Sequence, residues 1–139
     1  MISAVDSSVI LDVLTDDPTH AASSEQALRL AAAAGQLVLC EIVVAEIFPA
    51  LNDEGLFDTF LQDWHLEFIP ASRQAAQLAG SHFARYLGRG GKKGRIVADF
   101  LVGAHAQIHA ERLLARDRGY LRDYFADLPL LDPTKLAQA

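Results

Sequence analysis

Short apolar runs alternate with longer helix-like segments along the whole chain, and this alternation is the feature that most limits how it can fold. The expected strands are 2–5, 37–39, 66–69, 113–115 and 130–131. Between each strand and the next lies at least one segment with the spacing or composition of a helix. The pattern predicts a three-layer α/β/α fold around a mostly parallel central sheet of about five strands. Right-handed crossovers then place helices on both faces of the sheet.

The expected helices begin and end at recognisable residues. The polar cluster Asp-Ser-Ser at 6–8 is suited to cap the N-terminus of a helix over 9–14. The helix over 41–48 is expected to end near Pro49, because proline disrupts a helix interior. Further helices are expected over 20–34, 56–64, 71–87, 96–110 and 117–125. No repeat or linker interrupts the pattern, so residues 1–139 are expected to form a single domain.

The charge of the chain is unevenly distributed. Eighteen acidic and twelve basic residues give a net charge of −6, which by itself argues against a nucleic-acid partner. Five of the basic residues nevertheless gather in one glycine-rich segment: Arg85, Arg89, Lys92, Lys93 and Arg95. One interpretation is that this basic loop binds the phosphate backbone of a nucleic acid. The alternative is a solvated loop whose charge only keeps the protein in solution.

No segment has the character of a membrane span or a signal peptide. The longest uncharged runs, 30–40 and 100–110, have eleven residues each, whereas a spanning helix needs about 20. The first residues reach an acid at Asp6 without a basic stretch before it. We therefore expect a cytoplasmic protein with no membrane partner.

Two acids follow expected strands. Asp6 comes directly after the strand 2–5, and Asp117 comes shortly after the strand 113–115. The carboxyl ends of parallel strands meet at one edge of a sheet, where ligands bind, so both acids belong at that edge. Each also has a structural explanation, as the N-cap of the helix that follows it.

Two further acids, Glu46 and Asp99, lie inside apolar helical segments, so each is either at the margin of a buried face or paired. Ionised carboxylates that gather in one place need a cation, and an oxygen-only set of ligands suits Mg²⁺ or Mn²⁺. Periodicity alone does not select these acids over three others with apolar neighbours, which are Asp12, Glu67 and Asp132.

Four stretches of sequence make the choice by resemblance: Val5-Asp6-Ser7-Ser8-Val9-Ile10, Val44-Ala45-Glu46-Ile47, Val97 to Ala106, and Leu113 to Tyr120. In these stretches, and over essentially its whole length, the chain resembles PIN-domain proteins and specifically the VapC toxins of type II toxin–antitoxin pairs. The resemblance implies that Asp6, Glu46, Asp99 and Asp117 line one site for Mg²⁺, or Mn²⁺, with Ser7 and Ser8 in support. One residue departs from the pattern: Ala115 stands where VapC proteins usually carry Thr or Ser, so a supporting hydroxyl is missing.

The same resemblance implies a function. It implies a metal-dependent endoribonuclease that hydrolyses RNA phosphodiester bonds, leaving a 5′-phosphate and a 3′-hydroxyl. It also implies a VapB-type antitoxin that blocks the site, and a homodimer. The helices 41–48 and 56–64 offer an apolar patch for either contact, unless they only pack the core. Two other functions stay open: a different metal-dependent phosphotransfer domain, and a non-catalytic PIN-like module that binds RNA or protein.

Overall fold

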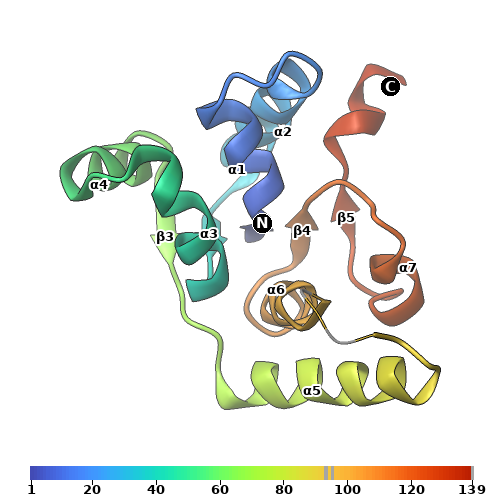
Figure 1. The fold of residues 1–139 in the computed structure, drawn as a ribbon. Coiled ribbons are helices and arrows are strands. Elements are labelled where there is room, and N and C mark those ends of the chain that lie inside the picture. The colour runs from blue at the N-terminus through green and yellow to red at the C-terminus, as the bar shows by residue number, and fades with distance from the viewer. Residues whose placement is uncertain (93, 95, 139) are drawn as a thin grey trace.

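The five expected strands form one parallel sheet. The computed structural model describes residues 1–92, 94 and 96–138, and in these it contains five strands, seven α-helices and one 3₁₀ helix. The sheet has the order β3-β2-β1-β4-β5, with β1 at its centre (Figure 1). The strands are β1 (Ser3–Val5), β2 (Leu37–Leu39), β3 (Leu66–Phe68), β4 (Arg112–Leu114) and β5 (Leu130–Leu131). The expected α/β fold is confirmed.

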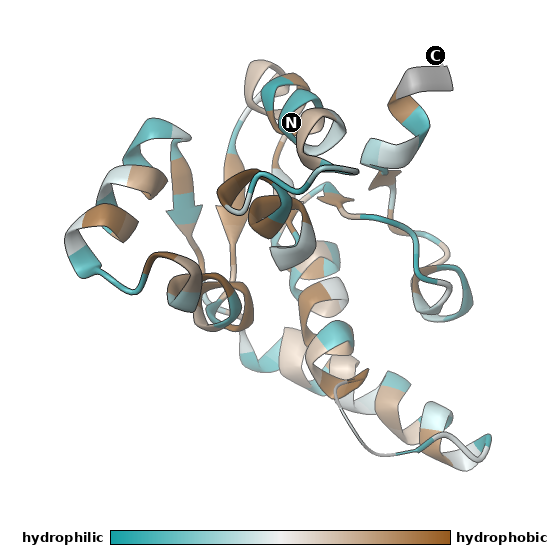
Figure 2. Cartoon of the chain, turned by 45° about the horizontal axis from the view of Figure 1, so that its top comes forward, coloured by the Kyte–Doolittle hydropathy of each residue, from teal (hydrophilic) through white to brown (hydrophobic). Residues whose placement is uncertain are grey.

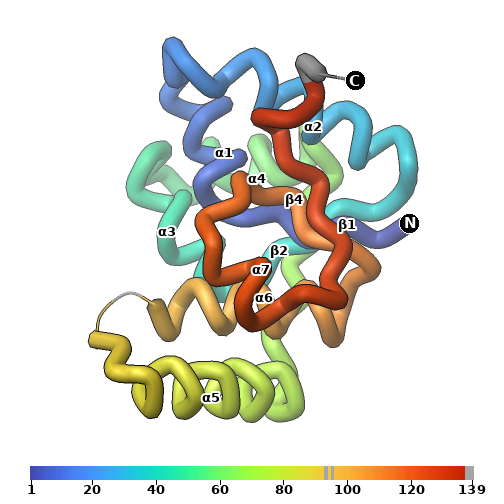
Figure 3. Tube along the Cα trace, turned by 90° about the vertical axis from the view of Figure 1, so that its right-hand side faces the viewer, coloured from blue at the N-terminus to red at the C-terminus, as the bar shows by residue number. Residues whose placement is uncertain are grey.

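Helices cover both faces of this sheet. Figure 3 shows the strands between α1 and α2 on one side and α5 and α6 on the other, with α5 packed along α6. In the part of the chain that the structure describes, none of the helices has the length and apolar character needed to span a bilayer. The helices are α1 (Ser7–Leu14), α2 (Ala21–Ala34), α3 (Glu41–Leu51), α4 (Glu54–Asp63), α5 (Arg73–Gly88), α6 (Ile96–His109), α7 (Tyr120–Tyr124) and the 3₁₀ helix η1 (Pro133–Gln138).

The central strands carry the core and set the place of the acids. Every residue of β1 and of β2 is buried, as expected for parallel strands that are covered on both faces. Val5 is in register with Leu114, and the backbone N–H of Asp6 donates to the Leu114 carbonyl at 3.0 Å. Residues that follow β1 and β4 therefore leave the sheet side by side at one edge, as the sequence predicts.

The expected end of one helix at Pro49 is wrong. Helix α3 continues through Pro49 to Leu51 and ends at Asn52, a left-handed residue (φ 48°) whose N–H donates to the Phe48 carbonyl at 2.7 Å. Proline fixes φ near the helical value, and the hydrogen bond it lacks is the one to the carbonyl of Ala45. Ala45 is exposed, so water can bind that carbonyl instead.

The last helix is also shorter than the sequence predicts. It covers only Tyr120–Tyr124 rather than 117–125. The Asp117 side chain accepts a hydrogen bond from the N–H of Gly119 at 3.0 Å, and Gly119 has a φ of 89°. This local bond favours a turn over a helix, because aspartate side chains compete with helical hydrogen bonding. Residues 117–119 thus form a turn, and the acid in it does not lie on a helix.

Candidate functional site

Asp6 lies at the end of β1 and also caps α1. Its carboxylate is only 3% exposed. The Oδ2 atom accepts a hydrogen bond from the Ser8 hydroxyl at 2.5 Å and a longer one from the Ser8 N–H at 3.4 Å. The N-terminus of α1 favours the negative charge of this acid. The N-cap expected from the sequence is therefore present, and it holds a buried carboxylate at the edge of the sheet.

Asp99 and Asp6 both contact the guanidinium of Arg118. Asp99 lies in the first turn of α6 and is 28% exposed. The Arg118 Nη2 atom donates to Asp99 Oδ1 at 3.1 Å and lies 3.7 Å from Asp6 Oδ2. Burial raises the pKa of Asp99, the charge of Arg118 opposes this rise, and the charge of Asp6 adds to it. One guanidinium thus compensates two carboxylates that repel each other.

Glu46 lies on the rim of the same region. It is exposed on α3, and its Oε1 atom accepts a hydrogen bond from the Ser7 hydroxyl at 3.1 Å, which ties α3 to the start of α1. Glu46, Asp99 and Arg118 line one open pocket of about 540 Å³. Ser7 and Ser8 therefore each hold one of the predicted acids.

The fourth predicted acid faces a different pocket. Asp117 is 16% exposed, and its Oδ2 atom lies 3.7 Å from Arg122 Nε. The two side chains line a smaller pocket of about 200 Å³ with apolar walls that include Leu121 and Phe125. Among the described residues, no hydrogen bond or ion pair joins Asp117 to Asp6, Glu46 or Asp99. The assignment of all four acids to a single site therefore stays a prediction.

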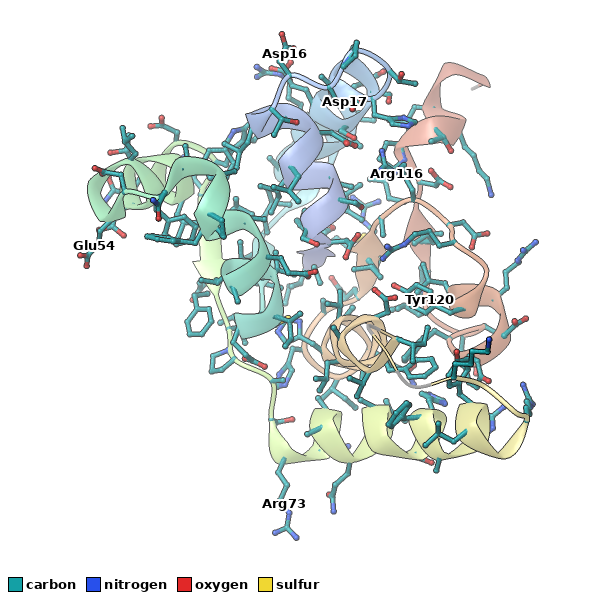
Figure 4. All side chains as sticks on the ribbon, viewed as in Figure 1. Asp16, Asp17, Glu54, Arg73, Arg116 and Tyr120 are labelled. Carbon is teal, nitrogen blue, oxygen red and sulfur yellow. The ribbon has the colours of Figure 1, made fainter. Side chains whose placement is uncertain are left out.

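Tyr120 adds a polar atom that the sequence did not mark as part of the site. Its ring packs edge-on against Phe100 of α6 (Figure 4), and the residue is 8% exposed. Its buried hydroxyl has no hydrogen-bond partner among the described residues. Burial raises the pKa of this phenol, and the charges of Asp6 and Asp99 raise it further. The charge of Arg118 partly opposes this rise, and the result is a neutral, buried hydroxyl that is influenced by both acids.

The donor chemistry of this region fits a hard divalent cation. In residues 1–92, 94 and 96–138 no three His, Cys, Asp or Glu side chains are gathered into a ready-made metal site. Asp6 and Asp99 nevertheless surround one positive charge with carboxylate oxygens, and an orphaned hydroxyl lies close by. Mg²⁺ is usually bound through one or two carboxylates and keeps several waters. Two acids and a free hydroxyl suit such a hydrated ion.

Most arginines near the C-terminus contact other side chains of the chain itself. Arg112 Nε donates to the Ser3 hydroxyl at 2.8 Å, and Arg116 Nη1 donates to Asp12 Oδ2 at 2.9 Å. The predicted basic loop is wrong for its first residue, because Arg85 lies in the last turn of α5, and Arg89 is the C-cap of that helix. The guanidinium carbons of Arg85 and Arg89 lie 5.2 and 5.4 Å from the centre of the Tyr124 ring. Lys92 is exposed, while Lys93 and Arg95 lie outside the described residues.

The three acids that periodicity left open have structural partners. Asp12 is buried and paired with Arg116. Asp132 accepts hydrogen bonds from the Asp117 N–H and from Thr134; burial alone raises its pKa, but these bonds lower it below its usual value. Glu67 is exposed and accepts a hydrogen bond from Gln36.

Two contributors to the site, Arg118 and Tyr120, are not among the site residues predicted from the sequence. Residues 99 and 118 are 19 positions apart, so no local periodicity shows that Arg118 turns toward the acids. An arginine and a tyrosine that flank a strand-end acid are the only local signal.

Comparison with known proteins identifies the fold independently. The sequence matches the PIN domain family over residues 4–125. A search of curated proteins finds no match. Among solved structures, VapBC2 from Rickettsia felis, bound to a DNA fragment from its promoter, aligns with a TM-score of 0.71 and 21% identity over 95% of this chain and 98% of that one. FitAcB from Neisseria gonorrhoeae aligns with a TM-score of 0.68 and 19% identity over 98% and 100%. VapBC-1 from nontypeable Haemophilus influenzae aligns with 0.69 and 17% over 97% and 100%.

Proposed function

This chain belongs to the PIN-domain family, and we propose from this premise that it is the toxin of a type II toxin–antitoxin pair and acts as a Mg²⁺-dependent endoribonuclease. One observation carries the proposal. Two carboxylates, Asp6 and Asp99, converge on a single positive charge at the carboxyl edge of the sheet, beside an open pocket of about 540 Å³. Ligands of open parallel sheets bind at that edge.

Each residue of the site has a proposed role. Asp6 and Asp99 would hold Mg²⁺ (or Mn²⁺), with Glu46 on the rim and Asp117 on the adjoining turn as further candidate ligands. The bound ion supplies positive charge for the phosphate oxygens and lowers the pKa of water. Tyr120 donates a hydrogen bond to an oxygen in the pocket. Glu46, exposed and oriented by Ser7, orients a water molecule or accepts its proton.

The basic loop is proposed to bind the RNA backbone. Arg85 and Arg89 are exposed, and each guanidinium lies over the Tyr124 ring. Arginine stacked on an aromatic ring suits both phosphate contact and base stacking. Such contacts compensate locally for the net charge of −6.

The proposed protein partners are a VapB-type antitoxin and a second copy of the chain. The structural neighbours include VapBC complexes and a toxin–antitoxin complex from Klebsiella pneumoniae. Apolar residues are frequent in α3 (brown in Figure 2), and Leu56 of α4 and Phe68 of β3 are 57% and 48% exposed. Val43 and Ile47 of α3 are buried in the core, so only part of the predicted patch is available to a partner.

Cleavage of total bacterial RNA by the purified protein tests the proposal. We expect discrete fragments with Mg²⁺, none with EDTA, and none from Asp6→Asn or Asp99→Asn. Asp127→Asn is the matched control, because it removes an exposed acid outside both pockets, and it should cleave like the unaltered protein. Unchanged cleavage by Asp6→Asn and Asp99→Asn would show that another site, or a contaminant, does the chemistry.

A second candidate function is suggested by the position of Asp117, which lines a different pocket from Asp99. A PIN-like module that binds RNA without cutting it does not need Asp117 in the same pocket as Asp6. The cleavage assay separates the two functions when RNA binding is measured beside it. Binding that is weakened by Arg89→Ala, together with no cleavage at any Mg²⁺ concentration, would identify the binding module.

A further inference from the structure

Arg118 occupies the point where a cation is needed between the two central acids. The carboxylate of Asp6 is 3% exposed and that of Asp99 is 28% exposed, whereas Arg118 is 47% exposed. The positive charge therefore reaches a buried acid pair from the solvent side. The charge of Asp6 raises the pKa of Asp99, and a counter-ion between the two stabilises the pair. Within the described residues, Arg118 is the basic side chain that contacts both acids.

The contacts of Arg118 differ from those of Arg116, an arginine two residues earlier in the chain. Only its Nη2 atom contacts the acids, at 3.1 Å from Asp99 and 3.7 Å from Asp6. It forms no two-pronged pair with either carboxylate, although the guanidinium is built for such pairs. By contrast, Arg116 is 26% exposed and binds the buried Asp12 at 2.9 Å. Arg118 thus reaches its two acids from a more exposed position than Arg116, through one hydrogen bond and one longer ion pair.

Arg118 also has neighbours other than the two acids. Its guanidinium carbon lies 5.5 Å from the centre of the Tyr120 ring, within the range of a cation–π contact. The side chain lines the open pocket with Glu46 and Asp99, where a phosphate group would lie. Arg118 lies within the turn between Asp117 and Gly119, and Gly119 has a φ of 89°. Arg118 can therefore leave the acids and keep favourable neighbours.

We propose that Arg118 is an exchangeable counter-ion of the metal site. It neutralises Asp6 and Asp99, and a divalent cation that binds the same oxygens displaces its guanidinium toward the pocket. Because two cations cannot share these oxygens without strong repulsion, Arg118 competes with the metal and raises the metal concentration at which the site fills. The inference rests on the proposed function and adds to it a residue that sets metal affinity.

Calorimetric titration of the full chain with MnCl₂ alone tests this competition without any RNA. We expect Arg118→Gln to bind Mn²⁺ at least about tenfold more tightly than the unaltered protein, because the competitor is gone. Arg118→Lys keeps a charge that competes, so its affinity should lie nearer the unaltered value. Arg29→Gln is the matched control: it removes a 69% exposed arginine that pairs with Glu25 on α2 and should change the affinity by less than about threefold, because solvent screens exposed charges.

A second readout does not depend on the affinity itself. Without metal, Arg118→Gln leaves Asp6 and Asp99 uncompensated, so its unfolding midpoint should fall below that of the unaltered protein. Mn²⁺ should raise the midpoint of Arg118→Gln by more than it raises that of the unaltered protein. A circular dichroism spectrum equal to the unaltered one shows that the variant is folded.

The outcomes separate this inference from the proposed function. An Arg118→Gln protein that binds Mn²⁺ no more tightly than the unaltered protein overturns the inference, even if Mg²⁺-dependent RNA cleavage is observed. Tighter Mn²⁺ binding without cleavage under any condition supports the exchange and refutes the nuclease. An equal gain in affinity from Arg29→Gln also overturns the inference, because it would show a general effect of net charge.

Discussion

The ion pair between Asp12 and Arg116 should be one of the most sensitive points of the fold. Asp12 on α1 is 9% exposed at its side chain, and its Oδ2 atom accepts from Arg116 at 2.9 Å and from the buried Ser24 hydroxyl at 2.7 Å. The pair joins α1 to the segment after β4 (Figure 4 labels Arg116). Asp12→Ala therefore removes the partner of a largely buried charge and the acceptor of a buried hydroxyl.

The expected loss follows from these contacts. Removal of one partner of a buried pair costs about 3–5 kcal/mol. Arg116 is 26% exposed and can recover part of its hydration, which reduces this to about 2–3 kcal/mol. The hydroxyl of Ser24 adds about 1 kcal/mol for its lost acceptor. We expect Asp12→Ala to lower the free energy of unfolding by about 3–4 kcal/mol, a large share of the roughly 5–15 kcal/mol typical of a domain.

Urea unfolding followed by circular dichroism measures this loss, with Glu25→Ala as the control. Glu25 pairs with Arg29 at 2.7 Å on α2, but the two side chains are 45% and 69% exposed, so this variant should lose less than about 0.5 kcal/mol. The double variant Asp12→Ala, Arg116→Ala should recover part of the loss, because no charge is left unpaired. An Asp12→Ala protein no less stable than Glu25→Ala would refute the reasoning.

Three further predictions concern packing, pH and metal. A Cβ atom at Gly103 would lie 2.6 Å from the Phe125 ring, so Gly103→Ala should destabilise the protein by about 1–3 kcal/mol in urea, whereas the unobstructed Gly80→Ala should stabilise it by about 0.5–1 kcal/mol. Burial lowers the pKa of His82 and of His105. Below about pH 6.5 the unfolded chain therefore binds more protons than the folded protein does. The free energy of unfolding should decrease as the pH falls from there toward about 5. A flat profile over that range would contradict the assigned burial. Mg²⁺ should raise the unfolding midpoint of EDTA-treated protein, and an unchanged midpoint at saturating Mg²⁺ would show that the acids hold no metal.

Local patterns were enough to predict the sheet and the position of its acids along it. Apolar runs ended by turn residues identify the strands, and the polar cluster at 6–8 caps α1 through Asp6 as expected. In the sheet β1 and β4 are neighbours, so the residues that follow them lie at the same edge, as expected. These features depend on residues close together in the sequence or on a whole-chain pattern.

The directions of the side chains could not be predicted in the same way. Asp117 reaches the expected edge, but the turn closed by Gly119 points its carboxylate at Arg122. Arg118 contacts Asp6 and Asp99 only because tertiary packing brings three distant segments together. Such contacts are decided by turn geometry and by non-local packing, which no periodicity records.

The central position of β1 affects the order in which the protein can form. One neighbour of β1 is β2, which follows early in the chain, but the other is β4, and Ser3 contacts Arg112 across a separation of 109 residues. During synthesis from the N-terminus, β1 keeps one open edge until β4 has been made. Contacts between such distant residues also slow folding, because long loops must close first. The pairing of β1 with β4 and the contact of Asp6 with Arg118 therefore form in the same late event. A nascent chain does not bring Asp6 and Asp99 together around Arg118 until nearly all of it has been made.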